Sequence, residues 1–277
     1  MRALSTLIEQ RAPGSDTRAM PNLPHPPTSS SPAPRPRAFT LDLDDTLWPI
    51  EPTLRRAEAA LRDWLAVHAP ATLAGCGDAG MLRLRAQVAL DHPELAHDLS
   101  TLRLITIHRA LVAAGDDPAL AEPAFEAFMA ARQQVTWFDD VRPALDRLAA
   151  HGPLLAVSNG NAELAPTGLA PWFAGSVSAR STGVAKPDAR IFAAACAQLG
   201  CRPDEVMHIG DDWRADIHGA REAGLHSAWV RRAELPLRDD SGGLGGLHGL
   251  LAAPPPPAGH HLEVPHLLAL ADWLDAL

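Results

Sequence analysis

The sequence predicts an α/β protein, in which helices cover both faces of a parallel sheet and a helical segment is inserted after the first strand. Two observations predict this fold class. After Trp137, short apolar runs alternate with segments of helical periodicity, which is the order of βαβ units. Before Trp137, residues 51–135 show helical periodicity with no convincing strand, so a group of helices interrupts the alternation.

The first regular element is expected to begin at Ala38. The preceding residues 1–37 are rich in proline and include a run of three serines, so they are expected to form a disordered or polyproline-like tail, whose presence and function stay open. The run from Ala38 to Leu43 is apolar and ends among acidic residues. It predicts a buried strand that presents carboxylates at its carboxyl end.

Four helices are expected in the inserted segment, separated by proline and glycine residues. They are Thr53 to Val67, Ala79 to Leu90, Glu94 to Ala114 and Pro118 to Gln134. The chain is therefore expected to have a sheet-based core formed by residues 38–50 and 136–277 and a helical segment at 51–135.

The rest of the core is expected to alternate between strands and helices. The expected strands are Leu154 to Val157, Val206 to Ile209, Ser227 to Val230 and Leu262 to Val264. The expected helices are Pro143 to Ala150, Pro187 to Leu199, Ala215 to Ala223 and Leu267 to Leu277. Residues 236–259 are rich in glycine and proline and predict a long surface loop.

Composition narrows the classes of function. The 277 residues are 47% hydrophobic, and 24 basic against 33 acidic side chains give a net charge of −9. This charge disfavours general binding to nucleic acid or to anionic membranes. The three cysteines have no paired spacing, and no apolar run reaches the length of a membrane span. We therefore expect a cytoplasmic protein without a disulfide framework.

The strand ends are where the ligand site of such a sheet is expected. Asp42 and Asp44 flank Leu43 at the end of the first strand, and two carboxylates at a turn can hold a divalent cation. Taken alone, an acidic strand end is as often a solvated turn.

Three further strand ends carry polar residues. Ser158 and Asn159 follow the second expected strand and could hold a phosphoryl group or form an ordinary turn. Lys186 precedes a helix start and could be a structural residue or a positive charge aimed at an anion. Asp211, Asp212 and Asp216 crowd three like charges into six residues, which favours a cation or hydrogen-bond donors beside them.

Taken together, these four motifs resemble the haloacid dehalogenase superfamily of phosphotransferases over residues 38 to about 232. The resemblance implies a Rossmann-like core and a helical cap of the first type. The segments Phe39 to Leu47, His97 to Arg103, Ser158 to Ala162 and His208 to Asp212 look like the bacterial flavin mononucleotide phosphatases of that superfamily. Members of that group also dephosphorylate the ribitylaminouracil phosphate of riboflavin synthesis.

The resemblance implies a Mg²⁺-dependent phosphatase acting through an aspartyl phosphate. Asp42 would be the nucleophile, and Asp44 would protonate the leaving oxygen and then activate water, oriented by Thr46. Mg²⁺ would be held by the carboxylates of Asp42 and Asp211 and by the backbone carbonyl of Asp44. Ser158, Asn159 and Lys186 would bind the phosphoryl group, and Asp216 would brace Lys186 or a metal-bound water. An acid at the position of Asp44 favours a phosphatase over a dehalogenase.

Several alternatives stay open. A phosphomutase or a catalytically idle binding protein could share the fold, and the chain could be a monomer or a homodimer. The expected partner is a small phosphorylated metabolite of unspecified identity. Arg103 could contact the substrate or pair with Asp98. Trp48 could stack on a planar ring, although an anchor at the hinge of the cap is the preferred interpretation.

Overall fold

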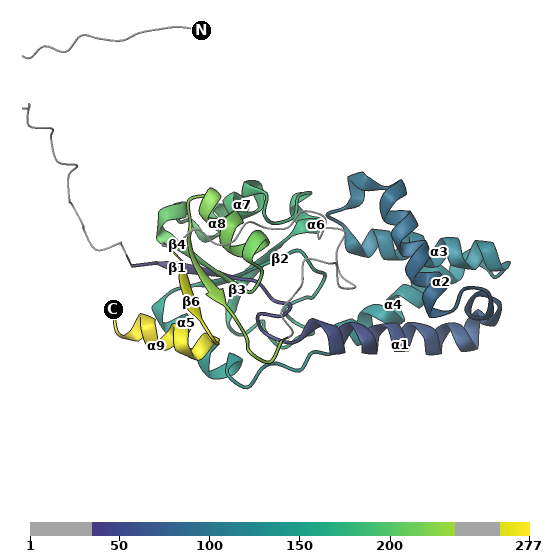
Figure 1. Cartoon of the computed structure of the whole chain (residues 1–277), viewed down its shortest axis with the longest axis horizontal. Coiled ribbons are helices and arrows are strands. Elements are labelled where there is room, and N and C mark those ends of the chain that lie inside the picture. Colours follow the sequence, from purple (N-terminus) through teal and green to yellow (C-terminus); the bar gives the residue numbers. More distant parts are fainter. Residues whose placement is uncertain (1–34, 236–260) are drawn as a thin grey trace, which may run out of the picture. The chain divides into compact units, whose positions relative to one another are not determined.

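The computed structural model describes residues 35–235 and 261–277. The tail expected at 1–37 falls outside them up to residue 34, as does all of the loop expected at 236–259. Within the described residues, six parallel strands form one sheet in the order β3-β2-β1-β4-β5-β6 (Figure 1). The strands are β1 Ala38–Leu41, β2 Leu154–Ser158, β3 Phe173–Ser178, β4 Val206–Gly210, β5 His226–Val230 and β6 Leu262–Val264. The α/β fold class is confirmed.

The centre of the sheet positions the site. β1 lies between β2 and β4, with Leu41 opposite both Ala156 and Ile209. This register brings the carboxyl ends of the three strands to the same edge. The residues that follow β1 and β4, together with the last residue of β2, therefore meet there, as expected for a parallel sheet.

Alternate residues of each strand face opposite layers of the core. Phe39 and Leu41 of β1 belong to the layer covered by α5 (Val141–His151) and α9 (Leu267–Asp275), which pack on each other. Leu155 and Val157 of β2 belong to the opposite layer, covered by α7 (Ala189–Leu199) and α8 (Gly219–Glu222). Burying a side chain of this size contributes about 1.5–3 kcal/mol, so two-sided burial stabilises the strands that carry the site.

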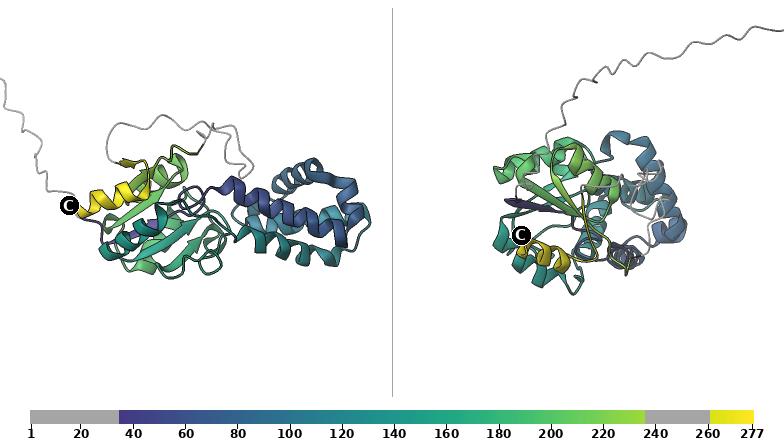
Figure 2. Two further views of the ribbon diagram at one scale, coloured as in Figure 1. Left: turned by 90° about the horizontal axis from the view of Figure 1, so that it is seen from below. Right: turned by 60° about the vertical axis from the view of Figure 1, so that its left-hand side comes forward.

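The segment between β1 and α5 is helical (Figure 2). It contains α1 Ile50–His68, α2 Pro70–Asp91, α3 Leu99–Ala114 and α4 Ala121–Arg132, with short 3₁₀ turns at Pro93–Leu95 and Pro118–Leu120. These four helices enclose their own apolar cluster, which includes Leu61, Leu65, Ile107, Leu111 and Phe128. Within the described part of the chain, no helix is long and apolar enough to cross a membrane.

Two helix boundaries in this segment differ from the expectation. α2 begins at Pro70 and is divided by a kink at Gly77, whose φ is 53°, so the helix expected from Ala79 corresponds to its part after the kink. α3 begins at Leu99 and not at Glu94, since the Asp98 side chain accepts a hydrogen bond from the Thr101 backbone nitrogen and so caps the helix. The start of α3 is thus set by a local cap, whereas no side chain caps the start of α2.

Two elements of the core were not expected from the sequence. β3 is an edge strand with partly exposed residues and a glycine at Gly175, so it lacks the apolar run that identifies a buried strand. A short helix, α6 (Ala179–Thr182), follows it. The helix expected at Ala215 to Ala223 instead begins as a π-helical turn at Trp213–His218 and continues into α8.

Candidate active site

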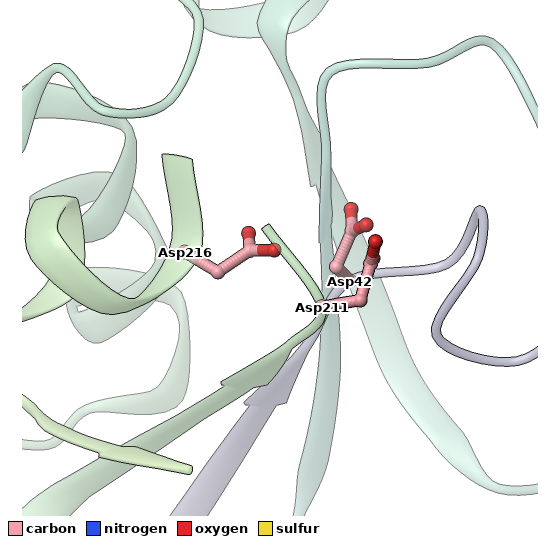
Figure 3. A group of neighbouring side chains, drawn as sticks. All are labelled: Asp42, Asp211 and Asp216. Carbon is pink, nitrogen blue, oxygen red and sulfur yellow. The ribbon is translucent and has the colours of Figure 1, made fainter. Parts of the chain in front are cut away.

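Three carboxylates lie together at the carboxyl edge of the sheet (Figure 3). Asp42 follows β1, Asp211 follows β4, and Asp216 lies in the π-helical turn that comes next. One oxygen of each lies within 4.8 Å of the others. In Figure 3 the side chains of Asp42 and Asp211 stand side by side and Asp216 faces them. Like charges this close repel each other unless cations balance them, and oxygen donors of this kind suit a hard dication.

Lys186 provides one positive charge inside this cluster. Its Nζ atom lies 2.7 Å from Oδ1 of Asp42 and 2.6 Å from Oδ1 of Asp216, and its side chain is almost fully buried. Although burial opposes the charge, the carboxylates of Asp216 and Asp42 raise the pKa of Lys186 above its ordinary value. Lys186 is therefore a permanent cation beside Asp42.

The two carboxylates that share this lysine differ in protonation. Burial raises the pKa of Asp42 to about 7, because Lys186 only partly offsets the loss of water and Asp216 adds repulsion. Burial acts in the same direction on Asp216, but Lys186 and His208 hold its pKa well below the ordinary value. The negative charge of the pair therefore resides first on Asp216.

Asp216 is held rigidly by its hydrogen bonds. Oδ1 also lies 3.1 Å from Nε2 of His208, and Oδ2 accepts from the Asp212 backbone nitrogen at 3.0 Å. Burial lowers the pKa of His208, so its ring is neutral. An ionised carboxylate only accepts hydrogen bonds, so Nε2 carries the proton, and Nδ1 accepts from the hydroxyl of Thr40 at 2.8 Å. Asp216 is thus held in place where it binds the ammonium group of Lys186.

Asp44 has a different environment from Asp42. Its carboxylate accepts from Nη2 of Arg132 at 2.8 and 2.6 Å and from Nε1 of Trp48 at 2.8 Å. Trp48 is fully buried, which agrees with an anchor and leaves no face for a ligand to stack on. The expected partner, Thr46, does not orient Asp44: its hydroxyl donates to Oδ1 of Asp211 at 3.0 Å, because the turn directs it toward β4.

Arg132 is a site residue that the sequence analysis missed. It is the last residue of α4, and its side chain is 2% exposed. Within the described residues its Nη1 atom is buried without a hydrogen-bond partner. An arginine at the end of the fourth expected helix, just before the chain returns to the core, was the available signal.

Ser158 and Asn159 both lie at the carboxyl end of β2. The hydroxyl oxygen of Ser158 accepts from the Gly160 backbone nitrogen at 2.9 Å. The side-chain amide of Asn159 accepts from the backbone nitrogen of Lys186 at 2.7 Å and donates to the backbone carbonyl of Lys186 at 3.0 Å. The Asn159 side chain therefore positions the backbone of the lysine, a role that the sequence analysis did not foresee.

One of the two alternatives for Arg103, a pair with Asp98, does not form. Arg103 does not pair with Asp98; its Nη1 atom donates to Glu58 of α1 at 2.6 Å. Asp98 is used instead as the cap of α3 and as a partner of Arg180 at 3.3 Å. The Asp98 carboxylate is therefore occupied by Thr101 of its own helix and by Arg180.

Comparisons with known proteins agree with this geometry. A family model described as haloacid dehalogenase-like hydrolase matches residues 36–224. The 5-amino-6-(5-phospho-D-ribitylamino)uracil phosphatase YigB of Escherichia coli is 31% identical over 70% of this chain and 83% of its own length. The glyceraldehyde 3-phosphate phosphatase of Methanopyrus kandleri is 28% identical over 74% of this chain and 89% of its own length.

A solved structure is also similar. The crystal structure of 2-haloacid dehalogenase from Pseudomonas syringae pv. Tomato DC3000 has a TM-score of 0.72 and 32% identity, over 87% of this chain and 99% of that one. The chain therefore belongs to the haloacid dehalogenase-like hydrolases, as the resemblance of its motifs implied. Within that family it is a phosphatase, like the relatives from Escherichia coli and Methanopyrus kandleri.

Proposed function

We propose that this phosphatase is Mg²⁺-dependent and hydrolyses small phosphomonoesters through an aspartyl phosphate on Asp42. The observation that carries this proposal is the position of Asp42: it lies 2.7 Å from a permanent cation, beside a second carboxylate with its own hydrogen bonds. Phosphoryl transfer needs a nucleophile in line with the leaving oxygen and positive charge around the phosphoryl oxygens. Lys186 supplies one such charge.

The donor set at the sheet edge fits a magnesium ion. The carboxylates of Asp42 and Asp211 would hold it, together with the backbone carbonyl of Asp44, whereas the oxygens of Asp216 are engaged by Lys186, His208 and the Asp212 amide. A bound Mg²⁺ would supply positive charge to the phosphoryl oxygens and would favour the ionised form of Asp42.

Asp42 and Asp44 would divide the reaction between them. An oxygen of Asp42 attacks phosphorus, the ester P–O bond breaks, and Asp44 gives a proton to the leaving oxygen. Asp44 then takes a proton from water, whose oxygen attacks phosphorus, so that inorganic phosphate leaves and the Asp42 carboxylate is restored. Ser158 and the amides around Asn159 would bind phosphoryl oxygens, and Lys186 would offset the repulsion between Asp42 and the phosphate.

We further propose that helices α1 to α4 act as a cap that selects the substrate, because the strand-end groups would contact only the phosphoryl group and the metal. The similarity to the Escherichia coli enzyme supports a phosphorylated intermediate of riboflavin synthesis as one substrate, with flavin mononucleotide as a second.

The test measures phosphate release from a panel that includes flavin mononucleotide, sugar phosphates and phenyl phosphate, with Mg²⁺ and with EDTA. 2-Chloropropionate serves as a control for dehalogenation, since one structural relative is a dehalogenase. We expect Mg²⁺-dependent phosphate release, a labelled phosphoryl group trapped on Asp42, and no chloride release. Chloride release without phosphate release would contradict the proposal.

A further inference from the structure

The helical segment contains an unbalanced group of charges around Arg103, whose side chain is buried. Arg103 of α3 is 6% exposed, pairs with Glu58 of α1 through Nη1, and places its Cζ atom 4.0 Å from the ring centre of Phe128. Glu58 engages one of the five N–H donors of this guanidinium. The other donors have no hydrogen-bond partner among the described residues.

Arg85 of α2 adds a second positive charge to this group. The pKa of Arg85 is lowered to about 10, mainly by burial and to a smaller extent by the positive charge of Arg103. The negative charge of Glu58 acts in the opposite direction. Within the described part of the chain, Arg85 forms no hydrogen bond and no ion pair. Arg85 is half-buried, and the charge of Glu58 acts on both guanidinium groups, of which it binds only that of Arg103. Removing such charges from water is unfavourable unless a partner compensates them.

The position of this group points toward the active site. Ser100 of α3 accepts a hydrogen bond from Asn161, which follows β2, and Arg103 lies one helical turn further along the same face. On α4, Phe128 lies one turn before Arg132, which binds Asp44. Arg103 therefore lies about one turn, roughly 5 Å along the helix, beyond the residues that contact the core.

From this placement we propose that Arg85 and Arg103 form a subsite for an oxygen-acceptor group on the leaving part of the substrate. Carboxylates, second phosphates and ring carbonyls share this chemistry, and the guanidinium fork matches two acceptor oxygens. Glu58 would hold Arg103 in place while its free donors and Arg85 meet the substrate. The inference rests on the proposed phosphatase function and adds a substrate class to it.

The test compares Arg85→Met with the wild-type enzyme, both in Mg²⁺. Methionine keeps an unbranched side chain and removes the charge. Arg83→Met is the matched control, since Arg83 is exposed on the same helix. The substrates are 3-phosphoglycerate for a carboxylate, fructose 1,6-bisphosphate for a second phosphate, flavin mononucleotide for ring carbonyls, and phenyl phosphate, whose leaving group has no acceptor besides the ester oxygen.

We expect Arg85→Met to lower kcat/KM at least about tenfold on one or more acceptor-bearing substrates, as the loss of a charge-assisted hydrogen bond does. The change on phenyl phosphate should stay within about twofold, and Arg83→Met should match the wild type on all four. The substrate that loses activity identifies the acceptor. An equal effect on every substrate, or no effect on any, would overturn the subsite.

Thermal unfolding separates this role from a structural one. Arg85 has no partner among the described residues, so Arg85→Met should leave Tm unchanged or raise it. A lower Tm together with a uniform loss of activity would show that Arg85 supports the fold and would overturn the subsite. Failure of the wild-type enzyme to release phosphate from all four substrates would instead overturn the proposed function, and the subsite with it.

Discussion

Arg132 binds both carboxylate oxygens of Asp44 through a single nitrogen, Nη2, at 2.8 and 2.6 Å. The two residues lie 88 positions apart in the chain, at the end of α4 and just after β1. The contact therefore joins the last helix of the inserted segment to the edge of the sheet. It also fixes the orientation of the carboxylate that the proposed reaction uses for proton transfer.

Replacing Arg132 should impair turnover more than substrate binding. Arg132→Met removes the bidentate contact, leaves Asp44 held by Trp48 alone among the described side chains, and should lower kcat about 10- to 100-fold, the usual effect of a misplaced catalytic group. Arg132→Lys keeps the charge and a single donor nitrogen on a shorter side chain, and should recover part of this loss. Arg142→Met, at an exposed position of α5, is the control. An unchanged kcat for Arg132→Met would show that Asp44 needs no such support.

Asp42→Asn should abolish phosphatase activity, with a loss of at least about a hundredfold, because an amide cannot act as the nucleophile. Steady-state assays and circular dichroism would show an inactive but folded protein. Activity above a few per cent of the wild-type value would exclude Asp42 as the nucleophile.

The same variant should change how stability depends on pH. The pKa of Asp42 is raised in the folded protein to about 7 from an ordinary value of about 4. Between these pH values the unfolded chain loses the proton and the folded protein keeps it, so the free energy of unfolding falls as the pH rises from about 4 to about 7. In EDTA, Tm of Asp42→Asn should therefore equal that of the wild type near pH 4 and exceed it at pH 8. A lower Tm for the variant at pH 8 would mean that the contact with Lys186 outweighs desolvation of the carboxylate.

Asp211→Ala should raise the Mg²⁺ concentration needed for half-maximal activity and lower the rate, since a direct oxygen ligand is lost. Asp212→Ala should have a milder effect, because the Asp212 side chain accepts from the backbone nitrogens of Arg214 and Ala215 and so caps the following turn. Titration of activity with Mg²⁺ measures both. A larger defect for Asp212→Ala at saturating Mg²⁺ would reverse the choice of ligand.

Gly160→Ala should lower activity without unfolding the protein. A methyl group at this position would lie 2.5 Å from Oδ2 of Asp44, so the carboxylate must move, and it would also approach Ser158 and Arg132. We expect kcat to fall about tenfold or more, because the carboxylate that transfers the proton would be out of position. Gly75→Ala, in an open part of α2, is the control and should keep full activity. Normal kcat in Gly160→Ala would show that the close approach to Asp44 is not needed.

The sequence by itself determined the class of the fold and most of the strand-end residues. Short apolar runs such as Leu154 to Val157 identify buried strands, because strands covered on both faces carry mostly apolar side chains. Parallel strands end at one edge of a sheet, so Asp42 and Asp211 were expected at the same edge once both strands were recognised, and the pairing of β1 with β4 brings them together. The start of α3 was placed less well, since Asp98 acts through a local capping contact that periodicity does not reveal.

The tertiary structure alone decided which side chains pair around the site. Arg132 reaches Asp44, Asn159 binds the Lys186 backbone, and Thr46 turns to Asp211, although no spacing in the chain distinguishes these partners from others. Such contacts join segments that are distant in the chain, and they depend on the exact position and direction of each side chain. Secondary-structure periodicity shows which face of an element is buried. Only the packed fold determines which polar group from another element lies against it.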